Sequence, residues 1–212
     1  MNSNNESLAR GALNESTKDK ILFTSIRLFS QHGYNEVSMR DIAQAVGIKA
    51  ASIYNHFESK KAILDAMYKF YDEQWDEAAP DIGELLHLAE TETPDVVLKN
   101  MLFDWKPELQ EVMNRIYVIA TREAMINPES LDVINSLVME RVKPRPRLLL
   151  KRMIELGKIE PLDIEAFVNL LSHVSHSATS LNLTPLRIDG ETWLRCWNML
   201  MSYIKPTEKQ AP

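Results

Sequence analysis

The sequence predicts an all-α protein, and three observations support that prediction. Apolar residues recur at three- and four-residue spacing along most of the chain, which is the pattern of an amphipathic helix. Helix-capping residues such as Ser38 and Ser59 precede several of these runs, and proline follows Thr93 at a first helical position. Only 6 of the 212 residues are glycine, as expected of helices joined by short turns.

The composition limits the classes of function. The formal charge is −6, but residues 1–65 carry eight basic and seven acidic side chains, so the acidic excess belongs to the rest. Overall acidity therefore argues against a general nucleic-acid coat protein and leaves local DNA binding open. Cys196 is the single cysteine, which suits a reducing cytoplasm. The chain has neither a signal-peptide core nor an apolar run of ~20 residues, so we expect a cytoplasmic protein without a membrane partner.

Residues 1–15 are polar and predict a flexible N-terminal arm. Ser16 or Thr17 then caps a helix that runs to about His32 and ends at Gly33. The apolar face of this helix is expected to pack against the elements that follow it.

The stretch from Ser38 to Lys60 predicts two short helices joined by a tight turn. Ser38 and Asp41 form a pair like a capping box at the start of the first helix. Gly47 fits the position after that helix where the backbone turns left-handed. The second helix is expected from about Ala50 to Phe57, and together the two make a helix-turn-helix.

The second of these helices has faces of different chemistry. Ile53, Phe57 and Ala50 share one side at 100° per residue, and we expect that side to be buried. The opposite side and the flanks are small or polar, which suits a DNA major groove. A solvated helix in an ordinary bundle accounts for the same pattern. The outward residues are Lys49, Ala51, Ser52, Tyr54, Asn55 and His56.

The wider stretch resembles the DNA-binding region of the TetR family of bacterial transcriptional regulators. The resemblance covers roughly residues 18–64: an Ile-Ala pair, Val46-Gly47-Ile48, then Ile53-Tyr54-x-His56-Phe57-x-x-Lys60 and Leu64. It implies a three-helix DNA-binding domain at residues 16–62 and a helical regulatory, ligand-binding and dimerisation domain at 63–212. Lys49 and Lys61 depart from the family pattern, in which a small capping residue and an acid are common at these positions. The departures concern the phosphate contacts and not the family.

We assign each candidate DNA-binding residue a role on this basis. The DNA-binding domain, called the head below, is expected to be positioned on phosphates by Ser38, Tyr54, His56 and Lys60. Base edges are expected to face Lys49, Ala51, Ser52 and Asn55. The partner is double-stranded operator DNA.

Beyond residue 60, further helices are expected at about residues 60–78, 94–105, 107–126, 128–142, 148–156 and 163–181, with another after 190 and a short one within 81–93. Prolines 144 and 146 predict a kink or break before Leu148. The basic run from Arg141 to Arg152 could form a second DNA-binding surface, but a solvated face paired with nearby acids is the favoured interpretation.

The regulatory part is expected to bind a small, mainly hydrophobic inducer. Candidate ligand-binding residues are apolar or aromatic with a few polar groups, although the same residues fit a plain core. The resemblance implies a homodimer through the last two long helices, and burial within a monomer is the alternative. The ligand candidates are Met101, Trp105, Met113, Tyr117, Met125, Phe167, Leu171 and Ser175, with His173 and His176 as further polar anchors.

No enzyme is predicted. The sequence has no Gly-rich phosphate loop, no nucleophile elbow and no HExxH motif, and His173 and His176 lack a third metal ligand at the next helical position. No cofactor or metal is expected. The sequence thus predicts a ligand-responsive, DNA-binding transcriptional repressor, the alternative being a helical small-molecule-binding or scaffolding protein without DNA binding. An activator would have the same contacts, and the inducer and operator are left open.

Overall fold

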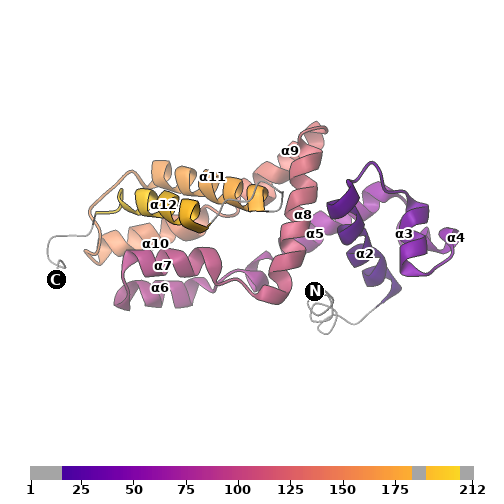
Figure 1. Ribbon diagram of the computed structural model, residues 1–212. Coiled ribbons are helices and arrows are strands. Elements are labelled where there is room, and N and C mark those ends of the chain that lie inside the picture. Colours follow the sequence, from indigo (N-terminus) through magenta and orange to yellow (C-terminus); the bar gives the residue numbers. More distant parts are fainter. Residues whose placement is uncertain (1–15, 183–189, 206–212) are drawn as a thin grey trace. The chain divides into compact units, whose positions relative to one another are not determined.

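The computed structural model describes residues 16–182 and 190–205, and every regular element in these ranges is a helix (Figure 1). The predicted all-α class is confirmed. Two compact units account for the chain: residues 1–78 with 106–137, and residues 79–105 with 138–212. Among the described helices, none is long and apolar enough to cross a membrane. The expected N-terminal arm lies outside the described residues.

Unit 1 holds the helix-turn-helix and two long helices. It comprises α2 (Thr17–His32), α3 (Met39–Val46), α4 (Ala50–Ile53), α5 (Lys60–Ala78), α8 (Pro107–Ala124) and α9 (Pro128–Val133). Helix α2 packs against α3, α5 and α8, so it forms the centre of this unit. Fully buried side chains of the unit include Ile21, Ile26, Phe29, Ile42, Ile53, Ile63, Met67, Ile116 and Ile119.

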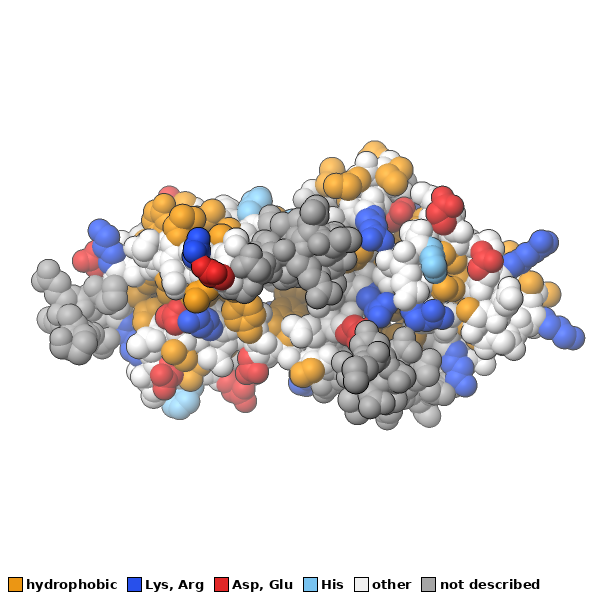
Figure 2. All heavy atoms as spheres, viewed as in Figure 1, with side chains coloured by type: hydrophobic (Ala, Val, Ile, Leu, Met, Phe, Trp, Pro, Cys, Tyr) orange, Lys and Arg blue, Asp and Glu red, His pale blue; other side chains and the backbone are white. Residues whose placement is uncertain are grey.

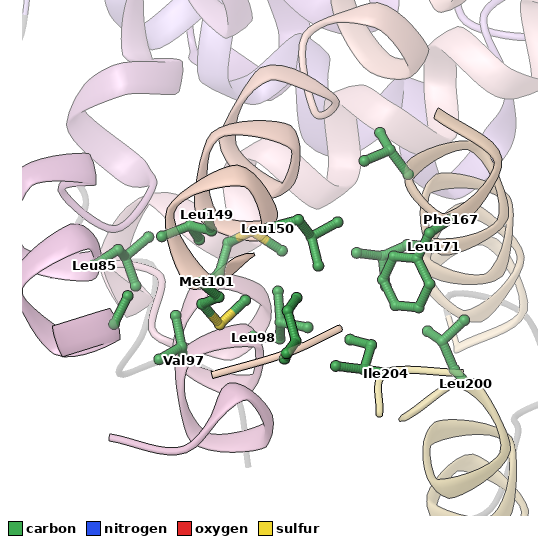
Figure 3. Close-up of a cluster of buried hydrophobic side chains, with 14 of the residues drawn as sticks. Leu85, Val97, Leu98, Met101, Leu149, Leu150, Phe167, Leu171, Leu200 and Ile204 are labelled. Carbon is green, nitrogen blue, oxygen red and sulfur yellow. The ribbon is translucent and has the colours of Figure 1, made fainter. Parts of the chain in front are cut away.

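Unit 2 surrounds a continuous apolar core. It contains α6 (Ile82–Thr91), α7 (Pro94–Phe103), α10 (Pro144–Glu155), α11 (Ile164–Asn182) and α12 (Gly190–Met201). All five helices contribute to this core or to the residues packed on it. Figure 3 shows side chains from these elements converging. The members of the core include Leu85, Val97, Leu98, Met101, Leu149, Leu150, Phe167, Leu171, Trp197, Leu200 and Ile204.

The capping residues place several helix boundaries where the sequence predicts them. Ser16, not Thr17, caps α2, and its hydroxyl accepts from the Asp19 backbone N–H at 3.2 Å. The Ser59 hydroxyl accepts from the Ala62 N–H at 3.0 Å at the start of α5. Gly157, with φ of +67°, follows α10 as expected. These predicted boundaries are confirmed. The sequence could predict them because one capping side chain or one glycine is enough to begin or end a helix locally.

Helices α4 and α7 end earlier than the sequence indicates. Helix α4 ends at Ile53 and not near Phe57, because the next residues form turns in which the Asn55 and His56 N–H groups bond three residues back. Ala50, expected inside, is exposed. Helix α7 ends at Phe103, two residues before the predicted end at Trp105.

The region around residues 134–147 also differs from the prediction. Residues Ile134–Glu140 form a π-helix in which hydrogen bonds reach five residues back, and the unit boundary falls inside it. The predicted break before Leu148 is present, but it lies at residues 141–143: helix α10 begins at Pro144, so both prolines lie in its first turn. The first turn of a helix has no internal acceptors for its N–H groups, and proline is tolerated there for that reason.

Candidate nucleic-acid interface

The turn between α3 and α4 is fixed by a capping box and a left-handed glycine. The Asp41 carboxylate accepts from the Ser38 N–H at 2.8 Å and the Ser38 hydroxyl at 2.6 Å. In return, the Ser38 hydroxyl accepts from the Asp41 N–H at 3.2 Å. These hydrogen bonds lower the pKa of Asp41. Gly47 ends α3 with φ of +81° and ψ of +29°, and its N–H returns to the carbonyls of Ala43 and Gln44. The predicted capping box and turn are confirmed.

The predicted outward residues lie on the short helix α4 and on the residues that flank it, 49 and 54–56. Lys49 occupies its N-cap position without a side-chain hydrogen bond, as expected of a residue that cannot accept one. Buried Ile53 and Phe57 hold the segment against the rest of unit 1. Lys49, Ala51, Tyr54 and Asn55 are exposed, whereas Ser52 and His56 are half-buried.

Positive side chains project from the end of unit 1 that carries α3 and α4 (Figures 1 and 2). Besides Lys49, the exposed residues of this end include Arg40 and Gln44 on α3. The site predicted from sequence omitted both, although their spacing of four residues places them on one helix face. That spacing, opposite the buried Ile42 and Ala43, is the signal that would have identified them.

The predicted phosphate contact Lys60 has a full set of partners within the protein. Its ammonium donates to the backbone carbonyls of Tyr34 at 2.7 Å and Val37 at 3.0 Å, and lies 3.4 Å from that of Asn35. It also lies 4.3 Å from the centre of the Tyr34 ring. Lys60 therefore joins the start of α5 to the loop between α2 and α3.

Two arginines of α8 bond to the C-terminal turn of α2. Arg122 donates to the Ser30 backbone carbonyl at 2.8 Å, and Arg115 lies 3.3 Å from the Ser30 hydroxyl. The carbonyls at a helix C-terminus carry a partial negative charge, so guanidinium groups are favourable there. Glu111 fixes Arg115 from the preceding turn at 2.8 Å. Helix α8 is thus tied directly to α2, the helix that precedes the helix-turn-helix.

A buried carboxyl lies on the inner face of α8. Glu123 is 6% exposed, and burial raises its pKa while the Lys60 ammonium acts in the opposite direction. Burial also raises the pKa of Tyr68 to about 12, and the Ser130 hydroxyl opposes that rise. Glu123 follows Ile116 and Ala120 at helical spacing, so its place on an apolar face was visible in the sequence but was not singled out.

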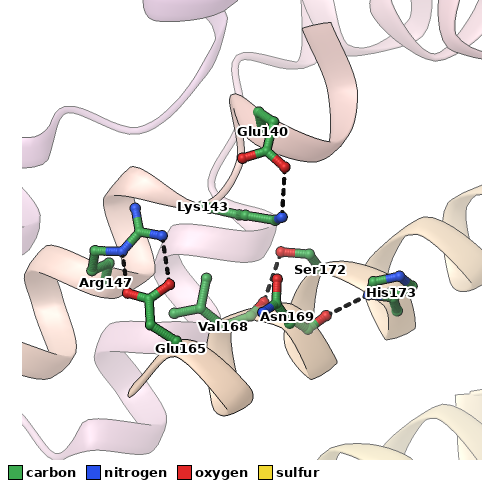
Figure 4. Close-up of polar contacts among 8 residues, drawn as sticks. All are labelled: Glu140, Lys143, Arg147, Glu165, Val168, Asn169, Ser172 and His173. Atoms are coloured by element: carbon green, nitrogen blue, oxygen red, sulfur yellow. Dashed lines mark hydrogen bonds and ion pairs between the residues drawn. The ribbon is translucent and has the colours of Figure 1, made fainter. Parts of the chain in front are cut away.

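In unit 2, the basic run after Arg141 is paired with acids. Arg147 donates to both carboxylate oxygens of Glu165, at 2.6 and 2.8 Å, and Lys143 lies 2.7 Å from Glu140 (Figure 4). Arg152 bonds Glu90 at 2.7 Å. The prediction that nearby acids pair with this run is confirmed.

The predicted ligand-binding residues fall into both units. Met113, Tyr117 and Met125 belong to unit 1, where the first two are buried and Met125 is 84% exposed. Met101, Phe167 and Leu171 are members of the apolar core of unit 2. Trp105 and Ser175 are half-buried residues of the same unit, and the Ser175 hydroxyl has no hydrogen-bond partner among the described residues. Their role in ligand binding stays a prediction.

Comparison with known proteins places the strongest similarity in the helix-turn-helix region. The family model of bacterial regulatory proteins of the tetR family matches residues 21–67. The chain is 50% identical over 52 residues to the biofilm operon icaADBC HTH-type negative transcriptional regulator IcaR of Staphylococcus aureus strain Newman. That match covers 24% of this chain and 28% of IcaR, so it spans little more than a quarter of the relative. The similarity to tetR-family regulators is thus established for residues 21–67.

Solved structures of transcriptional regulators, two of them described as TetR-family, share the fold over most of the chain. A regulator from Agrobacterium tumefaciens aligns with a TM-score of 0.66 at 20% identity, covering 89% of this chain and 97% of that one. PfmR from Thermus thermophilus aligns with a TM-score of 0.57 at 23% identity, covering 86% and 97%. A transcriptional regulator from Saccharomonospora viridis, in complex with choline, gives 0.61 at 23% identity over 88% and 96%. At these identities the likeness concerns the fold.

Proposed function

We propose that this protein is a DNA-binding transcriptional repressor of the TetR type that a small molecule releases from its operator. The observation that carries the proposal is the helix-turn-helix itself. Its capping box and left-handed glycine hold a short helix, and polar residues on either side of that helix, Lys49, Tyr54 and Asn55, are exposed. A matching region of 52 residues in a negative transcriptional regulator supports repression. We further propose that the protein acts in the cytoplasm and catalyses no reaction.

The proposed contacts divide by chemistry. Lys49, Ala51, Ser52 and Asn55 face base edges in the major groove, where an asparagine amide can pair with adenine. Ser38, Tyr54 and His56 position the head on phosphates. Tyr54 suits this role because 55% of it is exposed.

Binding to a palindromic operator requires two heads, and we propose a homodimer through α11 and α12. These helices and the residues just after them expose large apolar side chains in the single chain: Leu170, Leu194, Met199 and Tyr203. Apolar groups of this size are favourable at a subunit interface. Two heads would then meet half-sites about one helical turn apart, ~34–36 Å.

The proposed inducer is small and mainly hydrophobic, and the predicted ligand-binding residues of both units are candidates for contact with it. Release follows if the inducer binds better to a conformation whose head spacing does not fit the operator. Identical head spacing in solution with and without a bound inducer would contradict this mechanism.

The test is fluorescence anisotropy of the purified protein on DNA from upstream of its own gene, across a salt series. We expect nanomolar, salt-sensitive binding that unrelated duplex DNA does not displace. Asn55→Ala should change which operator variants are preferred, by about 1–3 kcal/mol at the contacted base pair. Tyr54→Phe should weaken binding to all sequences alike. Weak binding without sequence preference, on this DNA and on genomic fragments, would instead favour a helical ligand-binding or scaffolding protein.

A further inference from the structure

The loop between α2 and α3 contains backbone carbonyls that point toward a single ammonium group. The carbonyls of Tyr34, Asn35 and Val37 lie 2.7, 3.4 and 3.0 Å from the Lys60 nitrogen. The centre of the Tyr34 ring lies 4.3 Å from the same nitrogen. This ring packs edge-on against Phe29, with 5.2 Å between the ring centres. One side chain therefore satisfies acceptors from three residues of a loop that precedes Ser38, the cap of α3.

The number of donors limits what else this lysine can do. An ammonium has three N–H donors, and here three carbonyls lie within reach of them. Lys60 and the carbonyls of Tyr34 and Val37 are partly buried. A carbonyl that lost its hydrogen-bond donor there would therefore destabilise the folded protein. To pair with a DNA phosphate, Lys60 would have to give up a hydrogen bond to one of these carbonyls. An exposed lysine can bind a phosphate without losing a hydrogen bond within the protein.

We propose that Lys60 is a positioning residue of the DNA-binding head. Its ammonium holds the loop at residues 34–37 in the geometry that starts α3 at Ser38, and it does not pair with a DNA phosphate. The role rests on the DNA-binding function proposed above, and it differs from the phosphate contact that the sequence predicts for the same residue.

Lys49 provides the matched control. It is exposed at the start of α4, and no hydrogen bond or ion pair of its side chain is present among the described residues. Both lysines carry one positive charge and lie in the same head. Only Lys60 donates hydrogen bonds to the backbone of the loop between α2 and α3. Replacing each by methionine removes the charge and keeps an unbranched side chain of similar length.

The experiment measures two quantities for wild type, Lys60→Met and Lys49→Met. The first is amide hydrogen exchange of residues 33–38 in the free protein. The second is the slope of log K against log salt for the upstream DNA and for mixed-sequence duplex DNA. For Lys60→Met we expect exchange at least about tenfold faster and weaker DNA binding, with an unchanged slope. For Lys49→Met we expect unchanged exchange and a smaller slope, because an exposed ammonium that faces the major groove still adds to the positive charge that releases counterions from DNA.

Other outcomes separate the two proposals. A slope that falls by about 1 in Lys60→Met, with exchange of residues 33–38 unchanged, would show a phosphate contact and overturn the positioning role. If the wild-type protein bound neither the upstream DNA nor the mixed-sequence duplex, the proposed DNA-binding function would be wrong. The positioning role of Lys60 in DNA binding would then be wrong as well.

A measurement on the wild-type protein covers the case in which Lys60→Met does not fold. The Lys60 ammonium should give a ¹⁵N resonance protected from exchange with water, and mixed-sequence duplex DNA at low salt should leave its shift unchanged. A shift as large as that of the Lys49 ammonium would overturn the positioning role.

Discussion

The DNA-binding head, over residues 16–60, and unit 2 each illustrate one of two kinds of contact that both of them contain. In residues 16–60, polar side chains bond to backbone groups at the turns: Ser16 and Ser38 at helix starts and Lys60 at the loop before α3. In unit 2, five helices surround one apolar core in which Leu98, Leu149 and Leu150 are fully buried. The first kind of contact depends on the identity of a residue, and the second on its volume and hydrophobicity.

The two kinds of contact tolerate different substitutions. A capping hydroxyl or a left-handed glycine has few substitutes, because the backbone geometry requires that chemistry. A core position accepts any apolar residue that fills the space, and whole cores can be repacked. Identity reaches 50% over a quarter of the chain in IcaR, whereas PfmR and the Agrobacterium tumefaciens regulator align over 86% and 89% of it at 23% and 20% identity.

The largest effect should come from a cavity in unit 2. Leu98→Ala removes a fully buried side chain from the core, and we expect a loss of about 2–5 kcal/mol in the free energy of unfolding. Leu98→Met preserves volume and should cost less than about 1.5 kcal/mol. Urea denaturation measures both. Equal losses for the two variants would show that this core depends on residue identity as the head does.

A smaller effect is expected at the capping box. Ser38→Ala should cost about 1 kcal/mol of stability, whereas Ser38→Gly should cost only a few tenths. The hydrogen bonds from Ser38 lower the pKa of Asp41, so their contribution is present at neutral pH and is lost as pH falls through that lowered pKa. Thermal unfolding from pH 7 downward should show less acid loss in Ser38→Ala than in wild type. Parallel curves would contradict the role of this hydrogen bond.

The smallest effect should have the opposite sign. Burial raises the pKa of Glu123, so the folded protein holds its proton more tightly and wild-type stability falls as pH rises from the ordinary value of 4.5 through the raised one. Glu123→Gln removes this charge, and we expect a higher melting temperature than wild type at pH 7 and a vanishing difference at pH 4.

A neighbouring glutamate of α8 serves as the control for that substitution. Glu111 is paired with Arg115 at 2.8 Å and is more exposed, so Glu111→Gln should not stabilise the protein at pH 7. If both variants shifted the melting temperature in the same direction, general charge reduction would explain the effect in place of burial.

Local signals in the sequence predicted most helix starts and the turn of the helix-turn-helix. Contacts between distant residues could not be predicted in the same way. Lys60 and Tyr34 are 26 residues apart, and no periodicity links an ammonium to a loop carbonyl. The π-helix at Ile134–Glu140 was missed because seven residues are too few to distinguish its period from that of an α-helix. The ending of α4 was missed because the same apolar anchors, Ile53 and Phe57, fit a helix or a series of turns.

The shortness of α4 has a consequence for attempts to imitate this protein. Its four residues, Ala50–Ile53, include no side-chain cap, and buried Ile53 and Phe57 fasten the segment at its far end. Helices shorter than about 12 residues are marginal in water even for alanine-rich sequences. A synthetic peptide of residues 49–57 would therefore be unfolded, and grafting its side chains onto a longer, stapled helix would place Tyr54 to His56 on a different path. A compact mimic of this surface needs the packing face of α2 and α3 as well.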